Sequence, residues 1–227
     1  MALMNIVCFK VGDRYSAEYV NKLYSMVKRN TTFNFNFICF TDDAEGIKRH
    51  QESHIDVRPL PHEFLAHWWN RMALFKKGVL SGPCINIDLD VVIHDNIDEL
   101  FELDDEFYMV PSGIFGNDCY NDCVVKFNAD KHNFMWDEFS ENRQLLIPLH
   151  GVDFAMTSIL KLCKYEHKLF PEEWFWRFRT KEHSHKSATG DKDFKQANNK
   201  FCHFIKLNDT LKQHEVRDDE FVKKYWR

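Results

Sequence analysis

Residues 85–93 read INIDLDVVI, an apolar segment interrupted by Asp88 and Asp90. Residues 84–87 predict a buried strand that ends in Asp88-Leu89-Asp90, and ligands of open α/β sheets bind where such strands end. Because side chains alternate along a strand, both carboxylates are expected on the same side. Two buried like charges are costly without a cation, and Mg²⁺ or Mn²⁺ prefers such oxygen ligands. A solvated turn with two surface acids is the alternative, and the apolar flanks disfavour it.

Strand and helix patterns alternate on both sides of this segment. The strands are expected at residues 4–9, 35–40, 55–57, 84–87 and 107–111, and the helices after Ser16 and at 68–77 and 97–101. This order predicts an α/β fold with a mostly parallel sheet and helices on both faces. The second half of the chain predicts strands at 123–127 and 201–207 and helices at 130–140, 152–162 and 215–226. Residues 181–200 are polar and are expected to form a mobile loop or lid.

The composition narrows the class of protein further. The chain has 227 residues and a net charge of -5, so no broad basic face for nucleic acid is expected. Its seven cysteines include one close pair, Cys119 and Cys123, which indicates reduced thiols rather than a zinc site. The N-terminal residues lack the pattern of a secretory signal, and no segment is apolar for long enough to span a membrane. A cytoplasmic location is therefore expected.

Residues 85–101, INIDLDVVIHDNIDELF, resemble the metal-binding segment of GT-A glycosyltransferases, which include the glycogenin and bacterial galactosyltransferase families (family 8). The resemblance implies a Rossmann-like GT-A domain over residues 1–227. Residues 1–110 would form its nucleotide-binding half and residues 111–227 its acceptor half. It also implies a hexosyltransferase that uses Mn²⁺ or Mg²⁺. Such an enzyme moves a sugar from a nucleoside diphosphate sugar, with UDP-sugar as the expected donor, to a hydroxyl of a glycan or another acceptor.

The resemblance also implies which residues contact the donor. Tyr15 would stack on the base, although a helix-start core residue would look the same, and Arg71 would touch a donor phosphate or sugar unless it is a surface charge. The family's Lys-Pro-Trp is missing, and either Lys206 or Lys212 is expected to take the phosphate role of its lysine. The full set expected at the donor is Phe9, Lys10, Tyr15, Thr41, Asp42, Asn70, Arg71, Asp88, Lys206 and Lys212.

The metal ligands and catalytic residues follow from the same resemblance. Asp90 is expected as a direct metal ligand, Asp88 as a ligand and ribose contact, and His203 as the third ligand. A histidine satisfied within its strand is the alternative for His203. The catalytic residues are expected to be Asn121, Asp122 and Asp153, and Asp153 could equally be a plain helix cap.

Two other functions fit parts of the sequence. The D-x-D strand also resembles the nucleophile strand of haloacid-dehalogenase-type phosphatases, in which Asp88 would accept a phosphoryl group. Val91-Val92 stands where those enzymes have Gly-Thr, and two βα units precede the motif, both of which oppose this alternative. A non-catalytic module that binds nucleotide sugars is the other alternative, and the intact acid pair argues against it.

Overall fold

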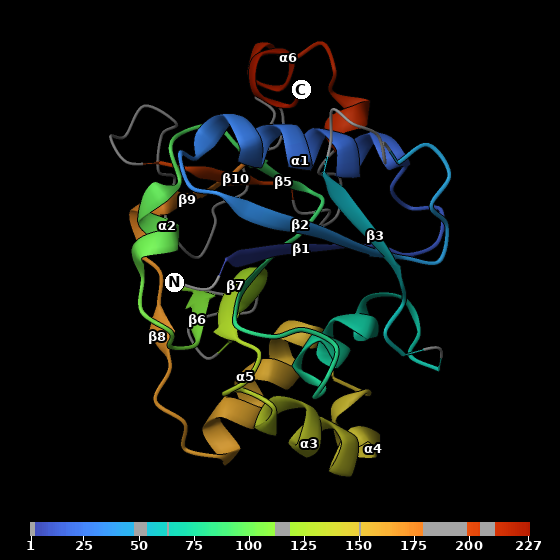
Figure 1. The fold of residues 1–227 in the computed structure, drawn as a ribbon, viewed down its shortest axis with the longest axis vertical. Coiled ribbons are helices and arrows are strands. Elements are labelled where there is room, and N and C mark those ends of the chain that lie inside the picture. The colour runs from blue at the N-terminus through green and yellow to red at the C-terminus, as the bar shows by residue number, and fades with distance from the viewer. Residues whose placement is uncertain are drawn as a thin grey trace.

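A computed structural model describes residues 3–47, 54–62, 64–111, 119–149, 151–178, 199–204 and 212–227 (Figure 1). Its centre is a seven-stranded sheet with the order β3-β2-β1-β4-β7-β6-β8. Strands β3, β2, β1 and β4 are parallel, and β7 is antiparallel to both β4 and β6. These strands are β1 (Met4–Lys10), β2 (Phe35–Thr41), β3 (Ile55–Pro59), β4 (Pro83–Ile87), β6 (Tyr108–Val110), β7 (Asn121–Asn128) and β8 (Lys168–Leu169).

Helices cover both faces of this sheet, which confirms the predicted α/β architecture (Figure 1). On one face lies α1 (Ala17–Asn30), whose buried residues recur at helical spacing from Tyr19 to Val27. On the other face lie η1 (His67–Phe75), α3 (Phe134–Glu141), α4 (Arg143–Leu146) and α5 (Val152–Leu162). Each face therefore has its own apolar core.

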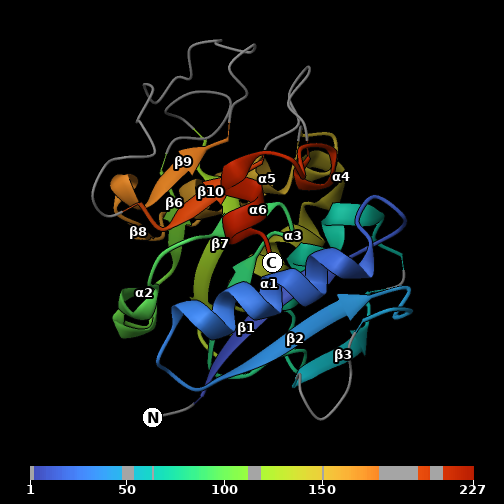
Figure 2. The ribbon, with the colours of Figure 1, turned by 90° about the horizontal axis from the view of Figure 1, so that it is seen from above.

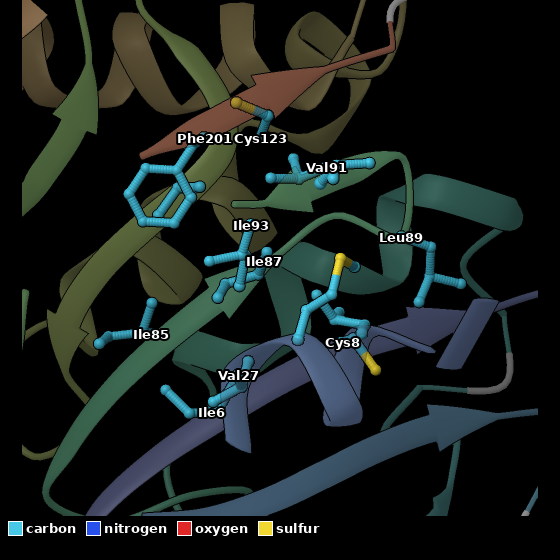
Figure 3. Close-up of a cluster of buried hydrophobic side chains, with 14 of the residues drawn as sticks. Ile6, Cys8, Val27, Ile85, Ile87, Leu89, Val91, Ile93, Cys123 and Phe201 are labelled. Carbon is cyan, nitrogen blue, oxygen red and sulfur yellow. The ribbon is translucent and has the colours of Figure 1, made fainter. Parts of the chain in front are cut away.

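A second, three-stranded sheet has the order β5-β10-β9, formed by β5 (Val91–Ile93), β10 (Phe201–His203) and β9 (Phe175–Arg177). It packs into the same core as α1, together with α6 (Glu220–Tyr225). Figure 3 shows Phe201 of β10 beside Ile93 of β5 above the β4 residues Ile85 and Ile87. The remaining elements are α2 (Asp98–Glu102), η2 (Glu172–Trp174) and η3 (Gln213–Glu215). In Figure 2, β9 and β10 lie side by side near α6.

The structure differs from the sequence predictions in several elements. The helix expected at residues 68–77 is a 3₁₀ helix, η1, in which the buried residues Trp69, Met72 and Phe75 recur every third position. The helices expected at 130–140 and 215–226 are shorter, and β5, β8 and β9 were missed because two or three residues carry no clear periodicity. The predicted loop at 181–200 and the end of the strand predicted at 201–207 lie mostly outside the described residues.

Two further expectations concern the membrane and the cysteines. Among the described residues, no helix is both long enough and apolar enough to cross a bilayer. All seven cysteines have free thiols, and six of them are buried.

Candidate active site

The D-x-D segment forms a turn that joins the two sheets. Asp88 extends the pairing of β4 by donating its amide to Cys123 O (2.9 Å), and Val91 N then bonds to Asp88 O (3.1 Å). Between the two acids, Leu89 is 3% exposed and points into the core near Cys8 (Figure 3). The buried Leu89 anchors this turn between Asp88 and Asp90. Side-chain alternation predicted both carboxylates at the end of a strand, and the structure places them in this turn instead.

His203 reaches these carboxylates from a distant part of the chain. Strand β10 runs antiparallel to β5, with His203 opposite Val91, and Phe204 N bonds to Asp90 O (2.9 Å). This pairing brings His203 Nε2 within 3.4 Å of Asp90 Oδ1. Asp88, Asp90 and His203 each offer one ligand atom, and these atoms lie within 4.8 Å of one another. Two carboxylates and an imidazole fit a divalent ion, and Mn²⁺ accepts the nitrogen more readily than Mg²⁺.

Asp90 is enclosed by hydrogen-bond donors. Its Oδ2 accepts bonds from Tyr15 Oη (2.9 Å) and from Lys212 Nζ, which also donates to Phe204 O (2.8 Å). Burial alone would raise the pKa of Asp90, but the charges of His203 and Lys212 outweigh it and hold the pKa well below its usual value. Asp90 therefore stays ionised. Tyr15 and Lys212 were predicted to lie at the donor, and their bonds to Asp90 were not predicted.

Arg71 links Asp88 to Asp122. From η1, its Nη1 lies 2.5 Å from Asp88 Oδ1 and 3.1 Å from Asp122 Oδ2. Burial lowers the pKa of Arg71, yet the charges of Asp122 and Asp88 more than compensate, and the pKa is raised. For Asp88, burial raises the pKa more than Arg71 lowers it. Arg71 is thus a fixed positive charge between two acids rather than a solvated surface residue.

Asp153 lies at the start of α5 and completes the acid group. Its carboxylate accepts the amide of Phe154 (2.9 Å) and is buried. Burial and the charge of Asp122 raise the pKa of Asp153 to about 6. Gly151 contacts it closely, since a Cβ at position 151 would lie 2.6 Å from Asp153 Oδ1. Asn121, which directly precedes Asp122 in β7, is buried, and its Oδ1 accepts the amide of Cys123 (3.1 Å).

A cleft of about 830 Å³ opens where β1 and β2 end, and Lys10, Gly12, Tyr15 and Asp42 contribute to its lining. Asp42 receives two contacts from Gly12 N (2.9 and 3.1 Å), which tie the first turn to the end of β2. The volume is that of a typical small-molecule site. Tyr15 lines this cleft and also bonds to Asp90, so its side chain borders both the cleft and the D-x-D turn.

Other residues expected at the donor have mainly structural contacts here. Phe9 stacks on Phe40 with centroids 5.3 Å apart. Thr41 is buried, and its hydroxyl donates to Asp43 O (2.7 Å), which also accepts the buried Lys10 Nζ (3.0 Å).

Asn70 is fully buried, and its amide nitrogen donates to Leu65 O. Lys206 lies outside the described residues. The donor roles of these residues therefore stay predictions.

The sheet order, the linking turn and the late strand beside it define a GT-A fold. Among solved structures, an active-site mutant of LgtC superposes with a TM-score of 0.64 over 97% of this chain and 93% of that one, at 13% identity. The apo form of the glycosyltransferase GlyE from Streptococcus pneumoniae TIGR4 has a TM-score of 0.55 at 15% identity, with 77% of this chain covered. The match spans 46% of the GlyE chain. No family model and no curated protein matches the sequence.

Proposed function

We propose that this protein is a metal-dependent glycosyltransferase that moves a sugar from a nucleoside diphosphate sugar to an acceptor hydroxyl. The observation that carries the proposal is the meeting of Asp88, Asp90 and His203 beside a nucleotide-sized cleft in a GT-A fold. We assign nucleotide binding to residues 1–110, where the cleft lies, and sugar and acceptor binding to residues 111–227 together with Arg71.

The residues around the turn suit the departure of a nucleoside diphosphate. Asp88, Asp90 and His203 would hold a Mn²⁺ or Mg²⁺ ion, which supplies positive charge for the leaving diphosphate. Lys212 adds a second positive charge at the same place, because its ammonium already lies on Asp90. Tyr15 fixes the Asp90 carboxylate by its hydroxyl and leaves its ring as a wall of the cleft, where the base would bind. We propose UDP as the nucleoside diphosphate that is released.

On the sugar side, the group of Arg71, Asp122 and Asp153 offers both donors and acceptors for hydroxyls. Arg71 holds Asp122 at 3.1 Å, so the guanidinium and the carboxylates stay in fixed positions. Such fixed groups orient a sugar without reorganisation when the reaction occurs. Asp153, with a pKa of about 6, is suited to hold a hydroxyl of the donor or to accept the proton of the acceptor near neutral pH.

The fold shared with LgtC and GlyE disfavours the phosphatase alternative, because the D-x-D segment is a turn between two sheets rather than the first strand of the chain. A binding module without catalysis keeps the same cleft and ion site. It differs from the proposed enzyme only in turnover.

Donor binding tests the proposal. We expect melting shifts with UDP-sugars that require Mn²⁺ in the wild type and that are lost in Asp88→Asn and Asp90→Asn. The control is Asp95→Asn, which removes the same charge from an exposed carboxylate just after β5. Shifts of equal size in the presence of a chelator, or in Asp88→Asn and Asp90→Asn, would contradict the metal assignment.

A further inference from the structure

Lys212 is held both at its ammonium and at its backbone. The ammonium lies on Asp90 Oδ2 and donates to Phe204 O (2.8 Å). The backbone amide donates to Glu215 Oε2 (2.6 Å), which caps η3, and the next residue, Gln213, is fully buried. The lysine backbone is therefore fixed to η3, and what its ammonium can reach depends on where η3 lies.

A hydroxyl of α1 holds η3 against the rest of the fold. Tyr19 Oη lies 2.6 Å from His214 Nδ1 and also accepts the backbone amide of His214 (3.3 Å). One hydroxyl thus contacts both the ring and the backbone of a residue two positions after Lys212. Because His214 is exposed, its ring is placed by the Tyr19 hydroxyl rather than by burial in the core.

The Tyr19 ring is itself packed between two aromatic residues. Tyr19 is 1% exposed, and its ring centroid lies 5.0 Å from that of Tyr15 and 4.9 Å from that of Trp226. Tyr15 donates its hydroxyl to the same Asp90 oxygen that binds Lys212. Tyr19 therefore contacts one of the two side chains that bond to this oxygen and holds the helix that carries the other.

We propose that Tyr19 and His214 are positioning residues that hold Lys212 where the leaving diphosphate would bind, an inference that rests on the proposed transferase function. The bond between Tyr19 and His214 fixes η3, and η3 fixes the Lys212 backbone. A lysine that starts from a fixed backbone has less freedom to lose when its ammonium moves from Asp90 to a phosphate, and such preorganisation strengthens binding. Neither Tyr19 nor His214 needs to touch the substrate.

Lysine labelling tests the hold on Lys212 without a metal or a nucleotide. Tyr19→Phe removes the hydroxyl and keeps the ring in the core, and His214→Ala removes the exposed ring. With trace acetic anhydride and detection by mass spectrometry, we expect Lys212 to react about fivefold faster in both variants than in the wild type, because local opening of η3 exposes its amine. Lys200, which is also buried and bonds to Asn96 O, should react at an unchanged rate.

The matched control is Tyr24→Phe. Tyr24 lies on the same helix, and its hydroxyl accepts the amide of His54 (3.3 Å) instead. This variant should leave the labelling of Lys212 unchanged. An unchanged rate at Lys212 in Tyr19→Phe would overturn the proposal, and so would an equal rise at Lys200, which would show a general loosening of the fold.

Binding of UDP in the presence of Mn²⁺ tests whether the hold on Lys212 serves the diphosphate. By calorimetry, Tyr19→Phe should raise the Kd about fivefold, and Tyr24→Phe should not. In a Lys212→Met background, Tyr19→Phe should have no further effect, because the hydroxyl acts through that lysine. Equal effects of Tyr19→Phe in both backgrounds would overturn the positioning role. Wild-type protein that binds no UDP would refute the proposed function, while the labelling rates would still decide whether Tyr19 and His214 hold Lys212.

Discussion

The Asp90 carboxylate is already paired with a cationic side chain of the protein itself, Lys212. Lys212 Nζ bonds to its Oδ2, and the lysine is 5% exposed, so its charge is largely shielded from water. A divalent ion and the Lys212 ammonium would therefore compete for the same carboxylate. Ion binding should therefore release Lys212 toward an incoming diphosphate, and this coupling makes Lys212 a residue with two partners.

Replacement of this lysine tests the competition. Lys212→Met should bind Mn²⁺ about tenfold more tightly than the wild type in the absence of nucleotide, because the carboxylate loses its competing charge. The same variant should bind UDP more weakly when Mn²⁺ is saturating. Calorimetric titration measures both, and Lys200→Met is the control, since Lys200 is also buried but bonds to Asn96 O. Mn²⁺ binding that is unchanged or weaker in Lys212→Met would refute the competition.

Asp153 gives a prediction about stability and pH. Its pKa is raised to about 6, so the folded protein binds this proton more tightly than the unfolded chain, whose aspartates have a pKa of about 3.9. The stabilisation from this group is full below the unfolded pKa and is lost as pH rises through about 6. Asp153→Asn, which stays neutral, should thus gain about 1 kcal/mol relative to the wild type between pH 5 and pH 8.

Urea unfolding of both proteins at the two pH values measures this difference. Asp137→Asn provides the control, because Asp137 is exposed on α3 and should show no such gain. A constant difference between Asp153→Asn and the wild type across this range would show that Asp153 titrates normally.

Among the secondary-structure elements, α5 begins with a close contact between the Gly151 backbone and the Asp153 carboxylate. Gly151 has an extended backbone, so its conformation alone does not require glycine, but a Cβ there would meet Asp153 Oδ1 at 2.6 Å. Gly151→Ala should therefore push the carboxylate aside and leave the helix intact.

We expect Gly151→Ala to lower kcat for transfer by at least about tenfold, since small displacements of positioned groups cost rate steeply. Its affinity for UDP with Mn²⁺ should stay within about twofold of the wild type, because the cleft proposed for the nucleotide lies on other elements. Steady-state kinetics and calorimetry give the two numbers. A normal kcat would remove Asp153 from the reaction, and an equal loss of nucleotide affinity would point to a wider distortion.

The helices and strands also show how much of the fold could be predicted from the sequence. The apolar strands β1, β2 and β4 and helix α1 follow from periodicity, because each buries a regular row of residues. Strands β5 and β9 have three residues each and become strands only through their pairing with β10. The residues of η1 matched a helical pattern, but they form a 3₁₀ helix that packs against α3. Local patterns therefore predicted the scaffold better than the elements that close the site.

In the whole molecule, contacts between residues far apart along the chain were also hard to predict from the sequence. The acids of the D-x-D segment were recognisable because they stand two positions apart within one motif. The bond between Lys212 and Asp90 joins residues 122 positions apart, and Tyr15 reaches Asp90 across 75 positions. Nothing local in the sequence marks such pairs. Lys212 comes near Asp90 because β10 pairs with β5, which directly follows Asp90 (Figure 1). Tyr15 reaches the same carboxylate from the segment just before α1.

We propose that this fold and its D-x-D turn catalyse sugar transfer with a divalent ion. The most direct measurement is nucleoside diphosphate release from a panel of UDP-, GDP- and ADP-sugars, with a saccharide mixture as acceptor and mass detection of the glycoside formed. We predict release and glycoside formation with Mn²⁺ for at least one donor, a fall of at least about 100-fold in Asp90→Asn, and loss with a chelator. Nucleotide binding with no release from any donor would contradict the account and favour a binding module, and full-rate transfer in chelator would contradict the role of the metal.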